Sequence, residues 1–215
     1  ILMPSSWSTV HSVNDAVTLA ENLGIKYYIV PIGAIYDRFI KDTEVLFEGD
    51  HHWDTTQENL QARIRGTVLM IYANRHKALL LNTTNKSELS MGYGTIYGDL
   101  CGALMVIADL YKTEVYEMAA WINRNSETIT KAPSAELKEG QKDTDSLPPY
   151  DVLDPILYSL NEGGKSKEQI LQEGVDSTLL ERIIRLRSSA AFKGHQLAPM
   201  IQTSTAPLLD RSKCI

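Results

Sequence analysis

Short apolar runs alternate with segments of helical periodicity, and this alternation constrains the fold more than any other feature of the sequence. The runs Tyr27–Val30 and Ala78–Leu81 are long enough only for short, buried strands. Between them, apolar residues recur at helical spacing from Leu60 to Ile71, which predicts a helix over residues 58–72. Strands separated by helices favour a parallel sheet covered on both faces, so we expect a doubly wound α/β fold.

The remaining elements are predicted from short apolar runs, from helical spacing of apolar residues, and from the residues that cap or end helices. Gly24 should end the first helix, Thr56 stands at a cap position, and Ser166 opens a capping-box pattern. Along residues 111–122, the apolar spacing predicts that four residues face the core: Val115, Met118, Ala119 and Ile122. A further strand is expected at residues 1–3, and the apolar run 104–107 fits either a strand or part of a helix. Further helices are expected at residues 13–23, 35–46, 111–122, 154–160 and 166–187.

The composition excludes several classes of function. The chain carries 21 Lys and Arg against 27 Asp and Glu, a net charge of −6, which is not the basic footprint that nucleic-acid binding needs. No apolar run approaches the roughly 20 residues that a membrane span requires. The two cysteines, Cys101 and Cys214, supply no disulfide framework, and Cys101 should be a small buried residue. These features predict a soluble, cytoplasmic domain with no nucleic-acid or membrane partner.

Two segments and the start of the chain lack the regular pattern. The sequence opens at Ile1 on an expected buried strand, which suggests a piece of a longer chain. Residues 131–151 hold three of the eight prolines and little periodicity, and a segment of this kind is typical of a lid or a linker. Residues 198–215 are polar, and we expect them to form a loose tail after a domain over residues 1–197.

Two motifs are better explained without function. Gly163-Gly164-Lys165-Ser166 invites comparison with a phosphate-binding loop, but that motif needs a glycine where Ser159 stands. His51 and His52 with Asp54 could ligate a metal, but adjacent histidines point differently and no third ligand lies at a helical spacing. We interpret the first motif as a loop with a helix cap and the second as a solvated loop.

Polar side chains gather after the buried strand that ends at Leu81. The segment Asn82–Glu88 supplies hydroxyls, amides and a carboxylate, and a glycine-rich stretch leads from it to Asp99. Glu88 and Asp99 carry hard oxygen ligands, the type that Mg²⁺ accepts when it is bound to phosphates. Because ligands of parallel α/β folds sit beyond the carboxyl ends of strands, a binding site is expected here. A capped helix followed by a glycine-rich turn explains the same residues equally well.

The chain resembles the NAD synthetases, ATP-dependent amidating enzymes of the adenine-nucleotide α-hydrolase-like fold. The resemblance extends from Met3 to about Pro199, and residues 141–150 are similar to the glutamine-dependent branch, in which a glutaminase domain precedes the synthetase domain. The matching stretches, in order, are Glu58–Gly66, Asn82–Glu88, Tyr97–Asp99, Asp109–Thr113, and Pro133–Leu137 running on to Leu147–Asp151.

This resemblance implies a two-step reaction. ATP adenylates the nicotinate carboxylate of deamido-NAD and releases pyrophosphate, and ammonia from glutamine or free ammonium then displaces AMP to give NAD. ATP as co-substrate and Mg²⁺ are therefore expected, together with a homodimer or higher homo-oligomer that pairs through the helix over residues 58–72.

The resemblance also assigns site residues by position. Glu88 should hold Mg²⁺ or approach deamido-NAD, and Asp99 should lie near the nicotinate and the incoming ammonia as the catalytic residue. Contacts to ATP are expected from Thr83, Lys112, Ser134 and Ser5, and contacts to deamido-NAD from Asn59, Arg63, Glu88 and Lys193.

Three departures qualify these expectations. The family's pyrophosphate loop and first strand would precede Ile1, and Ser6 stands where the family commonly has arginine. We therefore expect this piece alone to have little or no activity. A catalytically silent nucleotide-binding or assembly module, or another ATP-dependent amidating enzyme of the same fold, remains as an alternative.

Overall fold

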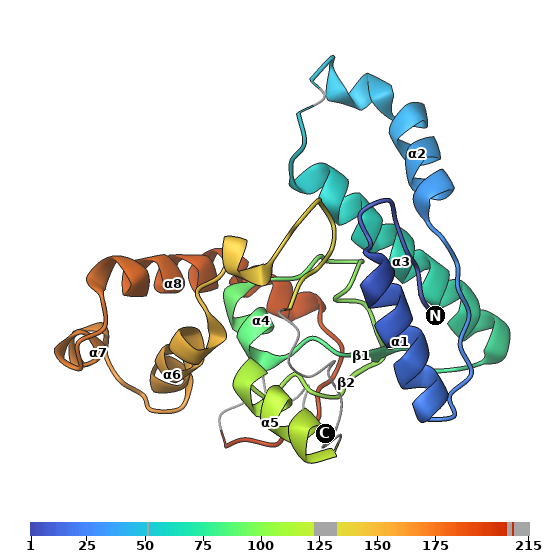
Figure 1. Ribbon diagram of the computed structural model, residues 1–215. Coiled ribbons are helices and arrows are strands. Elements are labelled where there is room, and N and C mark those ends of the chain that lie inside the picture. Colours follow the sequence, from blue (N-terminus) through green and yellow to red (C-terminus); the bar gives the residue numbers. More distant parts are fainter. Residues whose placement is uncertain (51, 123–132, 206–207, 209–215) are drawn as a thin grey trace. The chain divides into compact units, whose positions relative to one another are not determined.

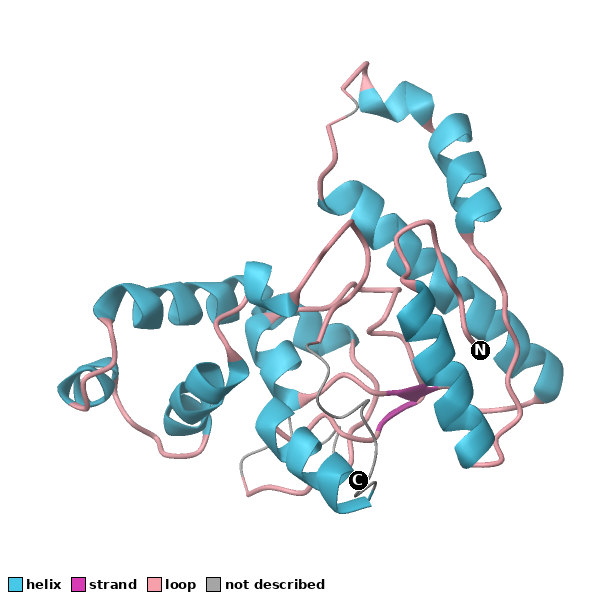
Figure 2. Cartoon of the chain, viewed as in Figure 1, coloured by secondary structure: helices cyan, strands magenta, loops and turns pink. Residues whose placement is uncertain are grey.

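The computed structural model describes residues 1–50, 52–122, 133–205 and 208 (Figure 1). Two compact units divide the chain: residues 1–78, 97–99 and 131–143 form unit 1, and residues 79–96, 100–130 and 144–215 form unit 2. Helices account for most of the regular structure, and the strands are short (Figure 2).

Within its described residues, unit 1 contains three α-helices and a short 3-10 helix between the second and the third. These are α1 (Val10–Asn22), α2 (Gly33–Asp42), the 3-10 helix Glu44–Phe47 and α3 (Thr55–His76). α1 starts where the Thr9 side chain accepts from the Ser12 N–H, and it ends before Gly24, whose φ of +62° suits glycine. The expected stop at Gly24 is therefore confirmed.

The start of α3 differs from the prediction. Asp54, not Thr56, is the N-cap: its carboxylate accepts from the Thr56 N–H at 2.6 Å. Gln57 completes a capping box by accepting from the Asp54 N–H at 3.0 Å. In a capping box the N-cap residue stands three positions before a Glu or Gln, here Asp54 before Gln57. The helix therefore begins several residues before its first regularly spaced apolar residue, Leu60.

The two strands expected in unit 1 are reduced to one bridge, between Leu2 and Ile29. The N–H of Leu2 donates to Tyr28, and the Leu2 carbonyl accepts from Val30, both at 2.8 Å. Pro4 has no N–H to continue this parallel ladder, although its carbonyl still accepts from Ile32 at 2.9 Å. The two segments pair in the parallel direction, but proline interrupts the ladder.

Unit 2 is built on a small parallel sheet. β1 (Leu81–Asn82) pairs with β2 (Leu104–Met105) in the register Leu81 to Leu104. Met200 forms a further parallel bridge to Met105 on the other side of β2, and both methionines are fully buried. Residues 199–201 are therefore part of the sheet and not the loose tail that polarity predicted; residues 206–207 and 209–215 lie outside the described part.

The helices of unit 2 are α4 (Lys86–Met91), α5 (Lys112–Ile122), α6 (Tyr150–Asn161), α7 (Lys167–Gln172) and α8 (Ser177–Ala190), followed by the 3-10 helix Ala191–Gln196. Another short 3-10 helix, Asp143–Asp145, begins on the last residue of unit 1 and continues into unit 2 along the sequence. One core cluster joins α4, α6, α7 and α8 through Met91, Leu157, Ile170 and Leu180. A second cluster surrounds β2 and includes Met105 and Met200.

Three expectations about unit 2 were wrong. The helix predicted over residues 166–187 is two helices, because Gly174 adopts φ +89° and Asp176 caps a new start. Of the residues expected to face the core from α5, Val115 and Ala119 are half-buried, but Met118 and Ile122 are 45% and 60% exposed. Cys101 is half-buried. The capping box at Ser166 is confirmed: its side chain accepts from the Gln169 N–H.

The predicted parallel α/β class is confirmed by the pairing of β1 with β2 across a helical crossover. None of the helices in the described ranges is long and apolar enough to cross a membrane.

Candidate functional site

The turn from β1 into α4 is fixed by its own side chains. Asn82 Oδ1 accepts from the Thr84 N–H at 2.8 Å, and Asn85 caps α4 by accepting from the Glu88 N–H at 3.0 Å. Glu88 Oε2 accepts in return from the Asn85 N–H at 3.1 Å, which completes a capping box. Thr83 lies between these residues at the carboxyl end of β1 and is exposed. The turn thus presents Thr83 on a rigid frame.

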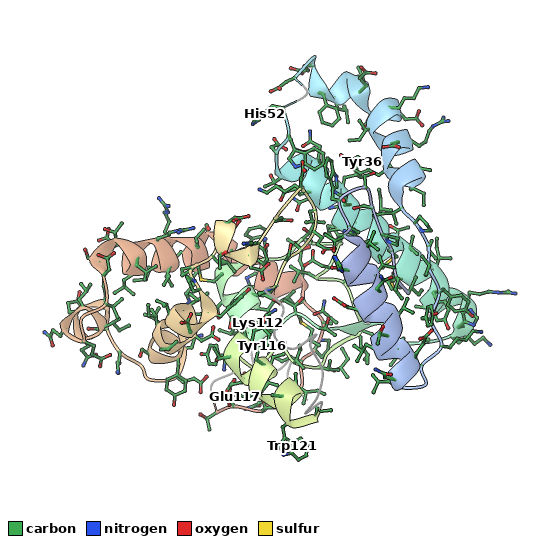
Figure 3. All side chains as sticks on the ribbon, viewed as in Figure 1. Tyr36, His52, Lys112, Tyr116, Glu117 and Trp121 are labelled. Atoms are coloured by element: carbon green, nitrogen blue, oxygen red, sulfur yellow. The ribbon has the colours of Figure 1, made fainter. Side chains whose placement is uncertain are left out.

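Glu88 also faces the start of α5. Its Oε1 lies 3.0 Å from the Nζ of Lys112, and the two side chains are 16% and 17% exposed. Lys112 Nζ further lies 5.4 Å from the ring centre of Tyr150 and 5.9 Å from that of Tyr116. Figure 3 shows Lys112 at the beginning of α5, with Tyr116 farther along the same helix. The carboxylate and the ammonium predicted for this site are therefore brought together, each with part of its surface open to solvent.

A cavity of about 440 Å³ lies beside this pair. Its lining includes Glu88, Tyr93, Arg187 and Lys193. The Nζ of Lys193 donates to the carbonyls of Gly92 and Gly94, both at 2.7 Å. Burial lowers the pKa of Arg187, against the opposing effect of Tyr111. One anionic and two cationic side chains therefore reach the same hollow within unit 2.

Arg187 was missed by the sequence analysis. It lies on α8, and its Nη2 donates to Asn161 Oδ1 at 2.5 Å. The only sequence signal is a basic residue near the end of an amphipathic helix, and many surface arginines share that signal.

In unit 1, the segment 133–143 is fastened to α3. Gln61 Nε2 donates to the Leu137 carbonyl at 2.7 Å, and Lys138 lies 3.5 Å from Glu58. Gln141 and Asp143 are buried. The part of the expected lid that the structure describes within unit 1 is thus held against α3; Lys131 and Ala132 lie outside the described residues.

The predicted site residues of unit 1 lie on four segments: α3, residues 133–143, residues 5–6 and residues 97–99. Asn59 and Arg63 stand four residues apart on α3, half-buried and exposed respectively. The Ser134 hydroxyl donates to the Gln141 carbonyl at 2.5 Å and accepts from the Glu136 N–H. Ser5 Oγ accepts from the Trp7 N–H at 3.2 Å, and Ser6 and Asp99 are exposed.

Arg65 is a further cation of unit 1 that the sequence analysis left unassigned. Its Nε donates to the Met3 carbonyl at 3.1 Å. Burial lowers its pKa, while the carboxylates of Glu136 and Asp99 act in the opposite direction. Arg65 therefore links α3 electrostatically to Asp99 and to the segment that carries Ser134. Its position two residues after Arg63 was the available sequence signal.

The described residues contain no group of three or more His, Cys, Asp or Glu side chains arranged to hold a metal ion by themselves. Among the predicted residues, Glu88 is the carboxylate that could serve as one ligand of a metal carried by a phosphate ligand. Mg²⁺ is commonly bound by one or two carboxylates together with substrate phosphates and water, and the single donor fits this pattern.

Comparisons with known proteins identify the family. The NAD synthase family model matches residues 1–197. The chain is 47% identical over 209 residues to a glutamine-dependent NAD(+) synthetase of Synechocystis and 42% identical over 212 residues to that of Thermotoga maritima. Each alignment covers 95% of this chain but only 37% of the relative.

Solved structures agree with this relationship. A glutamine-dependent NAD(+) synthetase from Cytophaga hutchinsonii superposes with a TM-score of 0.80 at 26% identity, covering 96% of this chain and 36% of that one. An NMN synthetase from Francisella tularensis gives 0.76 at 28% identity, with 94% and 76% covered. The Acinetobacter baumannii glutamine-dependent NAD+ synthetase, solved with ADP, gives 0.56 at 39% identity, with 96% and 38% covered.

Proposed function

The chain belongs to the NAD synthase family, and from this premise we propose that the protein that carries it makes NAD by ATP-dependent amidation of deamido-NAD. ATP adenylates the nicotinate carboxylate and pyrophosphate leaves; ammonia, from glutamine or free ammonium, then displaces AMP. Activation is required because a carboxylate is a poor electrophile, whereas the mixed anhydride carries a good leaving group. A glutaminase domain elsewhere in the protein would supply the ammonia.

The contact between Glu88 and Lys112 is the observation that carries this proposal. Lys112 places a compact ammonium where the ATP phosphates are expected, and this charge stabilises the pyrophosphate as it leaves. The preformed pair keeps the ammonium oriented at 3.0 Å from a carboxylate before the nucleotide arrives. Oriented charges of this kind need little reorganisation during the reaction.

Glu88 is the proposed ligand of Mg²⁺. The metal, when bound, would neutralise phosphate charge and polarise the reacting phosphorus. Glu88 keeps its Oε2 on the Asn85 N–H while Oε1 faces Lys112, so its carboxylate is held in place by the start of α4. The same carboxylate lines the cavity with Lys193, which is consistent with an approach to deamido-NAD.

The proposal also assigns a ligand to each of the other residues. Thr83, Ser5 and Ser134 bind ATP through their hydroxyls. Asn59 and Arg63 bind deamido-NAD from one face of α3, Lys193 binds it from the end of the chain, and Asp99 lies near the nicotinate. Their support comes from position in the family pattern, and the exposure of Thr83, Ser134, Asp99 and Arg63 leaves them accessible to ligands.

The test is a product assay on the protein at its full natural length. With deamido-NAD, ATP, Mg²⁺ and either ammonium or glutamine, NAD, AMP and pyrophosphate should form in equal amounts. Formation of ADP and phosphate, or nucleotide binding without turnover, would reject the proposal and favour a different ATP-dependent enzyme or a silent module. A parallel assay with the acid form of the mononucleotide distinguishes NAD formation from the NMN formation named for the Francisella tularensis protein.

A further inference from the structure

Asp154 is a buried carboxylate of α6 that none of the proposed binding roles uses. It is 4% exposed. Its Oδ1 accepts from the Ser87 hydroxyl at 2.6 Å, and its Oδ2 accepts from both the N–H and the hydroxyl of Thr113 at 2.9 Å. One carboxylate thus joins the start of α4 to the start of α5.

Ser87 extends this connection to Lys112. Its Oγ accepts from the Lys112 N–H at 2.8 Å while the same hydroxyl donates to Asp154. The N–H groups at the start of a helix lack partners within the helix. Here the first two N–H groups of α5, those of Lys112 and Thr113, are taken by side chains from α4 and α6. The direction of α5 at its first residue is therefore set by Ser87 and Asp154.

The same contacts fix the other partner of the pair. Glu88 follows Ser87 directly on α4, and the Lys86 N–H donates to the Leu110 carbonyl at 2.7 Å, just before α5. Two hydrogen bonds, Lys86 N–H to Leu110 and Lys112 N–H to Ser87 Oγ, therefore hold the start of α4 against the start of α5. A buried carboxylate such as Asp154 is costly unless hydrogen bonds satisfy it. The three hydrogen bonds that Asp154 accepts come from Ser87 and Thr113, the neighbours of Glu88 and Lys112 in the sequence.

We propose that Asp154 is a positioning residue for Lys112, acting through Ser87 and Thr113 to hold the ammonium opposite Glu88. This inference rests on the proposed function, in which Lys112 binds the phosphates of ATP. An error in the direction of α5 moves the Nζ of Lys112, at the end of a long side chain, more than it moves the backbone.

The experiment replaces Asp154 with asparagine in the protein at its full natural length. Asp154→Asn keeps the shape but exchanges one acceptor oxygen for a donor, so either the Thr113 groups or the Ser87 hydroxyl lose their acceptor. Asp151→Asn, the same change at an exposed site one turn earlier on α6, is the matched control. Asp154→Asn should lower kcat/KM for ATP by about 10- to 100-fold, as expected for loss of hydrogen bonds to a charged group. The control should stay within about twofold, the small effect usual for an exposed position.

The kinetic pattern separates positioning from general destabilisation. KM for ATP should rise, because Lys112 also binds ATP before the reaction, while KM for deamido-NAD stays unchanged. A fall in kcat no larger than the lost fraction of folded protein, with both KM values unchanged, would overturn the proposal. Thr113→Val, which removes only one hydroxyl donor to Asp154, should shift KM for ATP in the same direction by about threefold, the size of one modest hydrogen bond. It provides the test if Asp154→Asn does not fold.

A double-mutant cycle identifies the residue through which Asp154 acts. If Asp154 acts through Lys112, Asp154→Asn should not lower kcat/KM for ATP any further in a protein that already carries Lys112→Gln. Equal cost in both backgrounds would overturn the proposal. The cycle is also measured in the dissociation constant for MgATP, which needs no turnover. Absence of NAD formation by the unmutated protein would therefore reject the proposed function, while the binding cycle would still decide the role of Asp154.

Discussion

The Nζ of Lys86 lies 3.0 Å from Oδ1 of Asp109, and neither side chain has any exposed surface. Glu162 lies 2.7 Å from the same ammonium. Asp109 also accepts from the N–H groups of Thr203 and Ser204 at 2.8 and 2.6 Å. Lys86 and Asp109 therefore connect α4 and the segment before α5 to residues 203–204, which lie beyond the 197 residues matched by the family model.

Removal of Lys86 should destabilise unit 2 strongly. Lys86→Met leaves two carboxylates without their buried cation, and loss of one partner of a buried pair costs about 3–5 kcal/mol. Lys167→Met is the control, because its pair with Glu181 at 2.9 Å is 40% and 65% exposed and should contribute less than about 1 kcal/mol. Urea unfolding measures both, and equal costs would contradict the importance of the buried pair.

Asp109 should make stability depend on acid pH. Burial alone would raise the pKa of Asp109, but hydrogen bonds from Ser204, Lys86 and Thr203 outweigh it and hold the pKa below its ordinary value of 3.8. The carboxyl of Asp109 therefore binds a proton more readily in the unfolded chain than in the folded one. The ionised carboxylate stabilises the folded protein fully above pH 3.8, and this stabilisation is lost as the pH falls through the lower pKa of the folded state.

The measurement is the free energy of unfolding between neutral pH and about pH 3, where carboxyl groups titrate. Asp109→Asn should be less stable than the unmutated protein at neutral pH, and the difference should narrow as the pH falls below 4. A difference that is constant across this range would show that the charge of Asp109 does not contribute.

Gly92 should tolerate no side chain. It ends α4 with φ +66°, and a Cβ there would lie 2.0 Å from the Cβ of Ala190. Gly92→Ala should therefore cost about 2–4 kcal/mol, from left-handed strain together with overpacking. Gly164→Ala, at φ +57° with nothing within 4 Å of its Cβ, should show only the strain, about 1 kcal/mol. Chemical denaturation compares the two, and a cost for Gly92→Ala no larger than that of the control would contradict this packing.

Local features were predicted better than features that join distant segments. The cap at Ser166 and the stop at Gly24 depend on a few neighbouring residues, and both were predicted correctly. The closeness of Glu88 and Lys112 followed from the family pattern. The contacts of Asp154 with Ser87, 67 residues away, and of Ser204 with Asp109, 95 residues away, carry no periodic signal that a single sequence displays.

The buried faces of helices were a second source of error. Met118 and Ile122 follow helical spacing, yet they are largely exposed in unit 2, because the same period fits more than one face of a short helix. Polarity likewise misassigned residues 199–204, whose backbone pairs with β2 and Asp109 while several side chains remain polar. Composition describes side chains, whereas these segments are held by their backbones.

Glu88→Gln should separate the metal role of Glu88 from its role in the helix cap. The amide retains an oxygen that can accept from the Asn85 N–H, so the cap of α4 is kept and any loss of stability comes from the pair with Lys112 alone. The concentration of Mg²⁺ needed for half-maximal NAD formation should rise at least about tenfold, because a neutral oxygen is a weaker ligand for a hard cation. Asn85→Ala, which removes the cap and keeps the carboxylate, should instead lower stability by about 1 kcal/mol. The metal role would be contradicted by an unchanged Mg²⁺ requirement in Glu88→Gln.

The central claim, that the Glu88–Lys112 pair is the site of the ATP phosphates, is tested most directly by kcat/KM for ATP in Lys112→Gln at full natural length. Lys165→Gln is the control, because Lys165 pairs with Glu173 at an exposed site of unit 2. Lys112→Gln should lower kcat/KM for ATP by about 100-fold or more, the usual effect of removing one group that stabilises transition-state charge. Lys165→Gln should leave it unchanged. Equal activity in the two variants would contradict the assignment of Lys112 to the phosphates.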